Sequence, residues 1–122
     1  MRYWKFVCKR DTEAECFQRM LFGDTMDLWK EVKNVRRGDI LFLYNLETDI
    51  LYGPFVAESD GGLNIEPDAW SGKFPAQVRV KLPGAMAKIT GALAIFPFLK
   101  KRRCELTKEE GRDVLGYLLM HR

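Results

Sequence analysis

The stretch ILFLYNLETDILYGPFVAE, residues 40–58, determines which fold this chain can form. It holds two runs rich in β-branched and aromatic residues, 40–45 and 50–58, and the four residues between them are a loop length that suits an antiparallel hairpin. Gly53-Pro54 interrupts the second run. Because proline cannot donate to a sheet ladder, this pair predicts a β-bulge or a sheet edge inside the hairpin.

Further strand-like runs lie on both sides of this hairpin. Residues 3–8 and 74–81 alternate apolar and polar positions with a period near two, and 88–96 is a plausible additional strand. We expect the first of these strands to lie in the middle of the sheet.

Three helices are expected as well. A capping box at Thr12 and Glu15 predicts a helix over residues 13–22, an apolar stripe predicts a short one over 28–32, and a second capping box opens a last helix at 107–110. Helices and strands are segregated along the chain rather than alternating. The pattern therefore predicts an α+β fold with a curved antiparallel or mixed sheet of about five or six strands and about three helices.

Length and composition are typical of one globular domain, which we expect to span residues 1–122. The net charge is +3, a weak preference for anionic partners. The longest uncharged apolar run, 89–99, falls short of the ~20 residues that span a bilayer, and no signal-peptide pattern begins the chain. We therefore expect a cytoplasmic protein without a membrane partner.

The residues offer no recognisable catalytic machinery. The only histidine, His121, is the penultimate residue, and the sequence lacks nucleophile-elbow, Walker, dinucleotide-binding and zinc-protease motifs. Three cysteines, Cys8, Cys16 and Cys104, show no metal or redox spacing, which predicts free thiols. We expect a protein that is not an enzyme and that holds no metal and no cofactor.

Several strings resemble a known family, the DCD domain, which is named for development and cell death. The most specific are Gly-Leu-Asn-Ile at 62–65 and Phe-Pro-Ala-Gln-Val-Arg at 74–79, supported by the segments 21–23, 38–45 and 51–57. The resemblance implies a protein-interaction module, as in DCD-containing stress proteins, as one possible role in stress or defence signalling.

Other segments are similar to two related families. The Gly-Asp turn and strand at 38–44 and the start of the last helix resemble EVE domains, and Trp-Ser-Gly-Lys-Phe at 70–74 resembles YTH domains. All three families belong to the PUA-like superfamily, which implies a strongly curved sheet or open β-barrel flanked by helices. YTH domains hold a methylated adenine in an aromatic cage, and EVE domains are thought to hold modified bases. Related domains begin archaeal modification-dependent restriction proteins, which implies a larger restriction or RNA-processing partner.

The resemblance to YTH domains also implies a base pocket. Trp70 matches one aromatic wall and Phe22 falls near another, whereas the third wall falls at 64–65, where no aromatic residue stands. A pocket for a flipped-out base needs flat walls and a few amide groups. The candidate set is Trp70, Phe22, Trp29, Tyr44, Asn45, Asn64, Cys8, Lys9 and Asp11.

Structural roles compete with several of these assignments. Trp70 fits an exposed wall or a core anchor equally, and Trp29 lies on a periodic apolar face that favours core packing. Asn45 and Asn64 suit a base edge or a turn, and Asp11 suits a polar contact or a helix cap.

Basic side chains supply the candidate phosphate contacts, because neutralising phosphates releases counterions and makes binding salt-dependent. The set is Arg36, Arg37, Lys73, Arg79, Lys100, Lys101, Arg102 and Arg103. A solvated turn is the alternative for the run at 100–103. We therefore expect a non-catalytic reader of RNA or DNA, with a modified base in an aromatic pocket. The alternatives are the protein-interaction module, whose long loop would dock a partner, and a small-molecule or catalytic domain.

Overall fold

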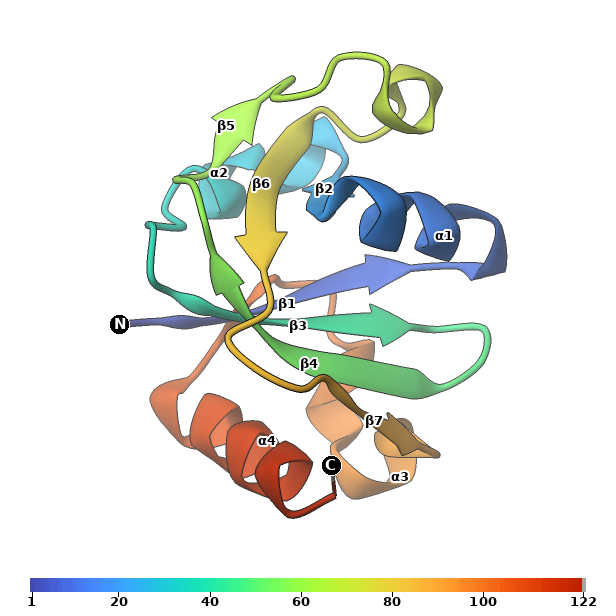
Figure 1. Ribbon diagram of the computed structural model, residues 1–122, viewed down its shortest axis with the longest axis vertical. Helices are drawn as coiled ribbons and strands as arrows, with labels where there is room; N and C mark the ends of the chain where they lie inside the picture. The colour runs from blue at the N-terminus through green and yellow to red at the C-terminus, as the bar shows by residue number, and fades with distance from the viewer. Residues whose placement is uncertain (122) are drawn as a thin grey trace.

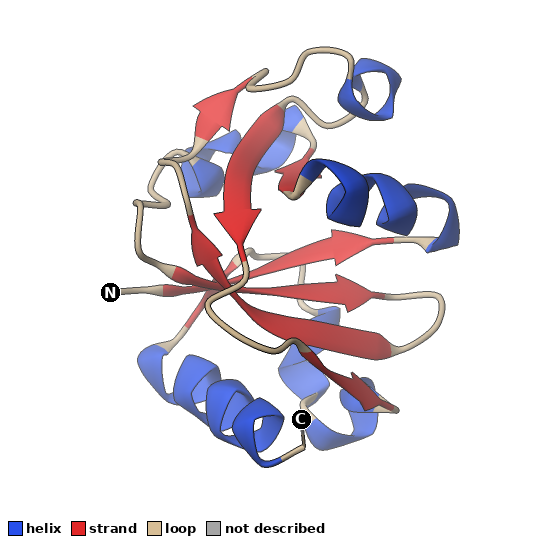
Figure 2. Ribbon diagram, viewed as in Figure 1, coloured by secondary structure: helices blue, strands red, loops and turns tan. Residues whose placement is uncertain are grey.

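The strands form one curved mixed sheet that closes into a half-barrel, as the computed structural model shows for residues 1–121 (Figure 1; Figure 2). Their order is β2-β6-β4-β3-β1-β8, with β5 paired to β6 and β7 paired to β4. The strands are β1 (Tyr3–Cys8), β2 (Leu21–Asp24), β3 (Ile40–Asn45), β4 (Ile50–Ala57), β5 (Gly62–Leu63), β6 (Ala76–Lys81), β7 (Ala87–Thr90) and β8 (Glu105–Leu106).

Short helices connect these strands, and one longer helix ends the described part of the chain. They are α1 (Arg10–Arg19), α2 (Trp29–Val32), α3 (Ala92–Ile95) and α4 (Lys108–Met120), with 3₁₀ turns η1 (Met26–Leu28), η2 (Ala69–Gly72) and η3 (Pro97–Lys100). In residues 1–121, no helix combines the length and the apolar character needed to cross a membrane.

The centre of the sheet is the predicted hairpin, with β1 running parallel to β3 along its full length. The β3–β4 register pairs Leu41 with Phe55 and Leu43 with Tyr52, so β4 contains one residue more than β3 between these pairs. The predicted bulge at Gly53-Pro54 is confirmed. Beyond it β4 turns from β7 to β6, which curls the upper half of the sheet over α1 (Figure 1).

Two apolar cores lie on opposite faces of this sheet. The inner core, inside the half-barrel, contains Trp4, Phe6, Phe22, Leu43 and Phe55 among others. The outer core lies under α3 and α4 and includes the side chains at 42, 114 and 118. On β1, Trp4, Phe6 and Cys8 belong to the inner core and Tyr3 to the outer core, while Lys5, on the opposite side of the strand from Trp4 and Phe6, is buried as well.

The first helix differs from its prediction at both ends. It begins at Arg10, so Thr12 is the third helical residue and not the cap. From there Thr12 Oγ1 accepts a hydrogen bond from the amide of the capping residue Lys9 at 2.9 Å. It ends at Arg19, and Leu21–Asp24 pair with β6 instead. The apolar spacing typical of a helix continues in the sequence through Leu21 and Phe22, but the backbone of these residues pairs with β6.

The region expected as a strand over 88–96 is also divided. Strand β7 ends at Thr90, Gly91 adopts a φ of 64° at the turn, and α3 follows directly. The last helix is as predicted: Thr107 Oγ1 accepts from the Glu110 amide at 3.1 Å, and the Glu110 carboxylate accepts from the Thr107 amide at 2.9 Å.

Candidate functional site

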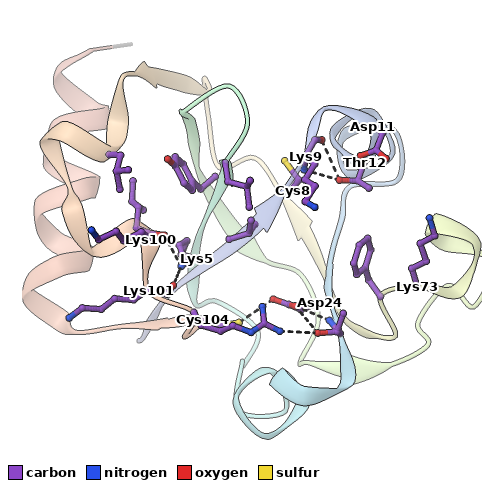
Figure 3. Close-up of a pocket in the computed structure, with 18 residues that line it drawn as sticks. Lys5, Cys8, Lys9, Asp11, Thr12, Asp24, Lys73, Lys100, Lys101 and Cys104 are labelled. Carbon is purple, nitrogen blue, oxygen red and sulfur yellow. Dashed lines mark hydrogen bonds between the residues drawn. The ribbon is translucent and has the colours of Figure 1, made fainter.

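A cavity of about 690 Å³ opens beside the carboxyl ends of β1 and β3. Its other sides come from the start of α1, the end of β2, residues 73–74 and the segment 99–104. Figure 3 shows Lys73 and the Lys100–Lys101 pair on opposite sides of this space. The parallel pairing of β1 with β3 places both strand ends at one edge, and the covering segment comes from the far end of the chain.

The walls of the cavity are apolar side chains. They are Val7, Tyr44, Leu46, Phe74, Leu93 and Leu99. The Tyr44 hydroxyl donates to Asp49 Oδ1 at 2.7 Å, which fixes the ring. Burial and this carboxylate raise the pKa of Tyr44, so the phenol stays protonated at neutral pH. Such walls suit a flat, weakly polar ligand body.

The floor carries a buried lysine. Lys5 is only 2% exposed, and its Nζ donates to the carbonyl oxygens of Leu99 at 3.1 Å and Lys101 at 2.5 Å. Burial lowers the pKa of Lys5, because desolvation penalises the ammonium more than nearby carboxylates stabilise it. The lysine therefore places a poorly solvated positive charge at the cavity floor.

A carboxylate and a thiol stand next to this lysine. Cys104 Sγ donates to Asp24 Oδ2 at 3.6 Å, while the Cys104 carbonyl accepts from the Lys5 amide at 2.8 Å. Burial raises the pKa of the Asp24 carboxyl and of the Cys104 thiol. Cys104 thus bonds to the β1 backbone at Lys5 through its carbonyl and to the Asp24 side chain through its thiol.

The mouth is cationic. Lys9, Lys73, Lys100 and Lys101 line it with exposed side chains, and no salt bridge involves them within the part of the chain described here. Arg102 also lines it but is paired with Asp27 at 2.5 Å. Asp11 provides a single opposing carboxylate. The surplus of free ammonium groups favours an anionic ligand.

Four of the predicted base-pocket residues line this cavity, namely Tyr44, Cys8, Lys9 and Asp11. The central one, Trp70, does not. It is 5% exposed, its indole Nε1 donates to the Thr12 carbonyl at 3.2 Å, and its ring packs on Gly23 and Phe74. Of the two alternatives for Trp70, the structure shows the core anchor, so the expected exposed wall is corrected.

The other predicted pocket residues also have structural roles. Phe22 is fully buried between Phe6 and Phe55, and Trp29 packs against the inner core. Asn45 is buried, and its side-chain oxygen accepts from the amides of residues 47 and 48. Asn64 occupies an exposed turn with a φ of 51°. None of these four residues lines the cavity, and the side chains of Phe22, Trp29 and Asn45 stabilise the fold around it.

Of the eight basic residues predicted to contact phosphates, some line the cavity and the others do not. Lys73, Lys100, Lys101 and Arg102 line the cavity. Arg79 instead pairs with Glu66 at 2.6 Å and Arg103 with Glu110 at 3.0 Å. Arg36 donates to the carbonyls of residues 33 and 35, and Arg37 lies outside the cavity.

Ion pairs hold the long connection between β4 and β6 against the rest of the domain. Glu66 accepts from Arg19 at 2.5 Å and from Arg79 at 2.6 Å, and these two guanidinium groups hold the pKa of Glu66 below its usual value. Together with buried Trp70, this clamp positions Lys73 and Phe74 at the cavity. The expectation that the loop docks a protein partner gains no support from such a restrained segment.

Sequence reasoning missed the floor residues Lys5, Asp24 and Cys104. One signal was available, since a lysine in the middle of a strand expected in mid-sheet needs a buried hydrogen-bond partner. No such signal identified the partners, the carbonyls at 99 and 101. Among residues 1–121, no three histidine, cysteine or carboxylate side chains cluster closely enough to hold a metal ion.

Comparison with solved structures defines the fold as that of YTH domains. The Mmi1 YTH domain, solved in complex with RNA, has a TM-score of 0.73 at 14% identity, covering 98% of this chain and 78% of that chain. The Pho92 YTH domain, solved in complex with m6A, has a TM-score of 0.71 at 15% identity, covering 96% and 82%. At this identity the likeness concerns the fold alone.

The sequence is more specific. Residues 4–95 match the family model described as the development and cell death domain, and the chain belongs to this family. The DCD domain-containing protein NRP-B of Glycine max is 48% identical over 82 residues, covering 62% of this chain and 25% of that protein. The B2 protein of Daucus carota is 46% identical over 82 residues, covering 62% and 40%.

The match thus spans 40% or less of these two curated relatives. Both are plant proteins, and they lend no support to the association with archaeal proteins that the resemblance implied.

Proposed function

We propose that this domain binds single-stranded nucleic acid across the mouth of the cavity, with phosphates on the rim and a base inside. The observation that carries the proposal is the ring of unpaired ammonium groups around an apolar-walled cavity. The rim cations come from three separate places in the sequence, Lys9, Lys73 and the Lys100–Lys101 pair, so the rim is a product of the fold and not of one charged run. The proposal includes no chemical step.

The dimensions and charges suit this ligand. A nucleotide has a flat base and an anionic phosphate, and the cavity offers apolar walls below and cations above. Stacking on aromatic or apolar side chains contributes about 1–3 kcal/mol per base, and rim cations gain counterion release. Two solved YTH domains with this fold are complexes, one with RNA and one with m6A, which supports the choice of nucleic acid over other anions.

Within residues 1–121, the cavity does not contain the aromatic cage expected for a methylated base. Trp70 is committed to the core, and Tyr44 and Phe74 are the aromatic side chains of the cavity. These two rings offer faces for stacking, but a three-sided aromatic enclosure is not assembled from the residues described. Recognition of a modified base is therefore not part of the proposal.

Fluorescence polarisation with short labelled RNA and DNA strands tests the proposal. With four free rim cations, log Kd should change with log salt by a slope of about 2 to 3 if each neutralises one phosphate. The double variant Lys100→Gln, Lys101→Gln should lower this slope by about 1.4 and weaken all sequences alike. The matched control Lys81→Gln, Lys88→Gln removes two exposed lysines that do not line the cavity.

Two results would contradict the proposal. One is absence of binding to every strand at 50 mM salt up to about 10⁻⁴ M, the upper end of non-specific affinities, by a protein with an intact circular dichroism spectrum. The other is equal loss of affinity in the rim variant and in the control, which would show that net charge alone attracts the strand.

A further inference from the structure

The cations on one side of the mouth belong to an irregular segment of the chain. Lys100 is the last residue of η3, and residues 101–104 connect it to β8 without helix or strand geometry. The side chains of Lys100 and Lys101 are exposed and line the cavity. Because such a connection has no ladder of its own, the position of these two ammonium groups depends on the contacts that hold the backbone around them.

Lys5 holds this backbone at three points. Its Nζ donates to the carbonyl oxygens of Leu99 at 3.1 Å and Lys101 at 2.5 Å, one on each side of Lys100 (Figure 3). Its amide donates to the Cys104 carbonyl at 2.8 Å. In residues 1–121, no other hydrogen bond reaches the carbonyls of Leu99 and Lys101. One residue of β1 therefore holds the segment that carries two of the free rim cations.

The other contacts of the segment hold its two ends. The Leu99 side chain is buried at the start, and Glu31 Oε1 accepts from the Cys104 amide at 2.9 Å near the start of β8. Arg102 pairs with Asp27, but both side chains are well exposed, and an exposed ion pair does little to hold a backbone in place. The backbone between these ends, which carries the rim lysines, therefore depends on the buried ammonium.

The charge and the burial of Lys5 make these contacts stronger than ordinary hydrogen bonds to the backbone. The residue is only 2% exposed, so water competes poorly for its N–H groups, and a charged donor binds a carbonyl more strongly than a neutral one. Removing the ammonium would leave the carbonyls of Leu99 and Lys101 without their donor. The segment would then be more stable in a conformation that turns these carbonyls toward water.

We propose that Lys5 is a positioning residue of the nucleic-acid rim, and that its buried ammonium keeps Lys100 and Lys101 where they meet phosphates. This pair lies across the mouth from Lys73 (Figure 3), so its loss would leave one side of the mouth without correctly placed free cations. The inference rests on the proposed nucleic-acid binding. It adds to that site a residue that controls affinity without touching the ligand.

A double-mutant cycle tests this role. Fluorescence polarisation with one labelled RNA strand gives Kd and its salt slope for the wild type, Lys5→Met, the rim variant Lys100→Gln, Lys101→Gln, and the triple variant. Lys5→Met should lower the slope by about 1.4 and weaken binding about tenfold to thirtyfold at 0.1 M salt, as loss of two phosphate contacts does. The triple variant should bind within about twofold of the rim variant, because Lys5 acts only through the lysines already removed.

The matched control is Lys88→Met, which removes the same charge from an exposed lysine that does not line the cavity. It should leave the salt slope unchanged and Kd within about twofold of the wild type. Circular dichroism shows whether each variant is folded under the binding conditions. If Lys5→Met does not fold, Lys5→Gln replaces it in the cycle with the same expected results. Its amide keeps N–H donors in the buried site, but its stem is one bond too short to hold both carbonyls at their present distances.

The outcomes separate the role of Lys5 from the binding proposal. A folded Lys5→Met protein with the slope and affinity of the wild type overturns the positioning role and leaves nucleic-acid binding intact. A triple variant that loses a further ~0.7 in slope and about fivefold in affinity also overturns it, because additive losses indicate that Lys5 contacts a phosphate itself. Absence of binding by the wild-type protein overturns the nucleic-acid proposal, and the positioning role with it.

Discussion

Replacing Trp70 by alanine should strongly destabilise this domain and should not simply remove a binding contact. The indole is 5% exposed, donates to the Thr12 carbonyl at 3.2 Å and packs on Phe74. Truncating a buried tryptophan costs about 3–5 kcal/mol, a large part of the 5–15 kcal/mol that stabilises a typical domain. With a urea dependence of about 2 kcal/mol per molar, the unfolding midpoint should fall by about 2 M.

Urea unfolding followed by circular dichroism measures this loss, because fluorescence would change with the tryptophan itself. The half-buried Trp29, which packs against the same core, is the matched control, and Trp29→Ala should cost less. The reasoning is refuted if Trp70→Ala lowers stability by less than about 1 kcal/mol while oligonucleotide affinity disappears. That result would indicate that Trp70 contacts the ligand as an exposed wall of a binding site.

Three further changes test the structure. Gly111→Ala should lower the free energy of unfolding in urea by about 1–3 kcal/mol, because the added Cβ would lie 2.1 Å from Tyr3 Cγ. The control Gly116→Ala, where the added Cβ meets open space, should raise the free energy of unfolding by about 0.5–1 kcal/mol. Equal effects of the two changes would contradict the packing of α4. Burial raises the pKa of Asp24 above its ordinary 3.8, so the stability that it contributes is present below pH 3.8 and lost as pH rises through the folded value. Asp24→Asn should therefore raise the unfolding midpoint at pH 7 but not at pH 3, and an unchanged midpoint at pH 7 counts against the buried charge. Thr107→Ala should lower the thermal midpoint by removing a cap worth about 1 kcal/mol, and no change would show that the cap is dispensable.

Local signals predicted the parts of the fold that depend on neighbours in sequence. The hairpin over 40–57, its bulge at Gly53-Pro54 and the cap at Thr107 all rest on contacts within a few residues. Strand β2 could not be predicted in this way. Its residues continue the helical periodicity of α1, and they become a strand because β6, more than fifty residues further on, supplies the ladder.

The candidate site was predictable only in part, for a similar reason. Basic residues at 73 and 100–102 indicated a cationic surface, and the structure places them around one cavity. The burial of Trp70 depends on Gly23, where an added Cβ would lie 2.7 Å from the indole. The role of Lys5 depends on carbonyls 94 and 96 residues away. Neither of these long-range contacts can be predicted from the residues next to Trp70 or Lys5 in the sequence.

The segment after residue 96 also covers the edge of the sheet at β1. The family match ends at residue 95, yet β8 and the Cys104 carbonyl cover the side of β1 that β3 leaves open. A chain shortened to residue 95 would present β1 as a bare edge, a template for strand addition by another copy. The same cut would return the Lys5 ammonium to water. Shortened versions of the domain should therefore self-associate, and boundaries chosen for expression should extend past α4.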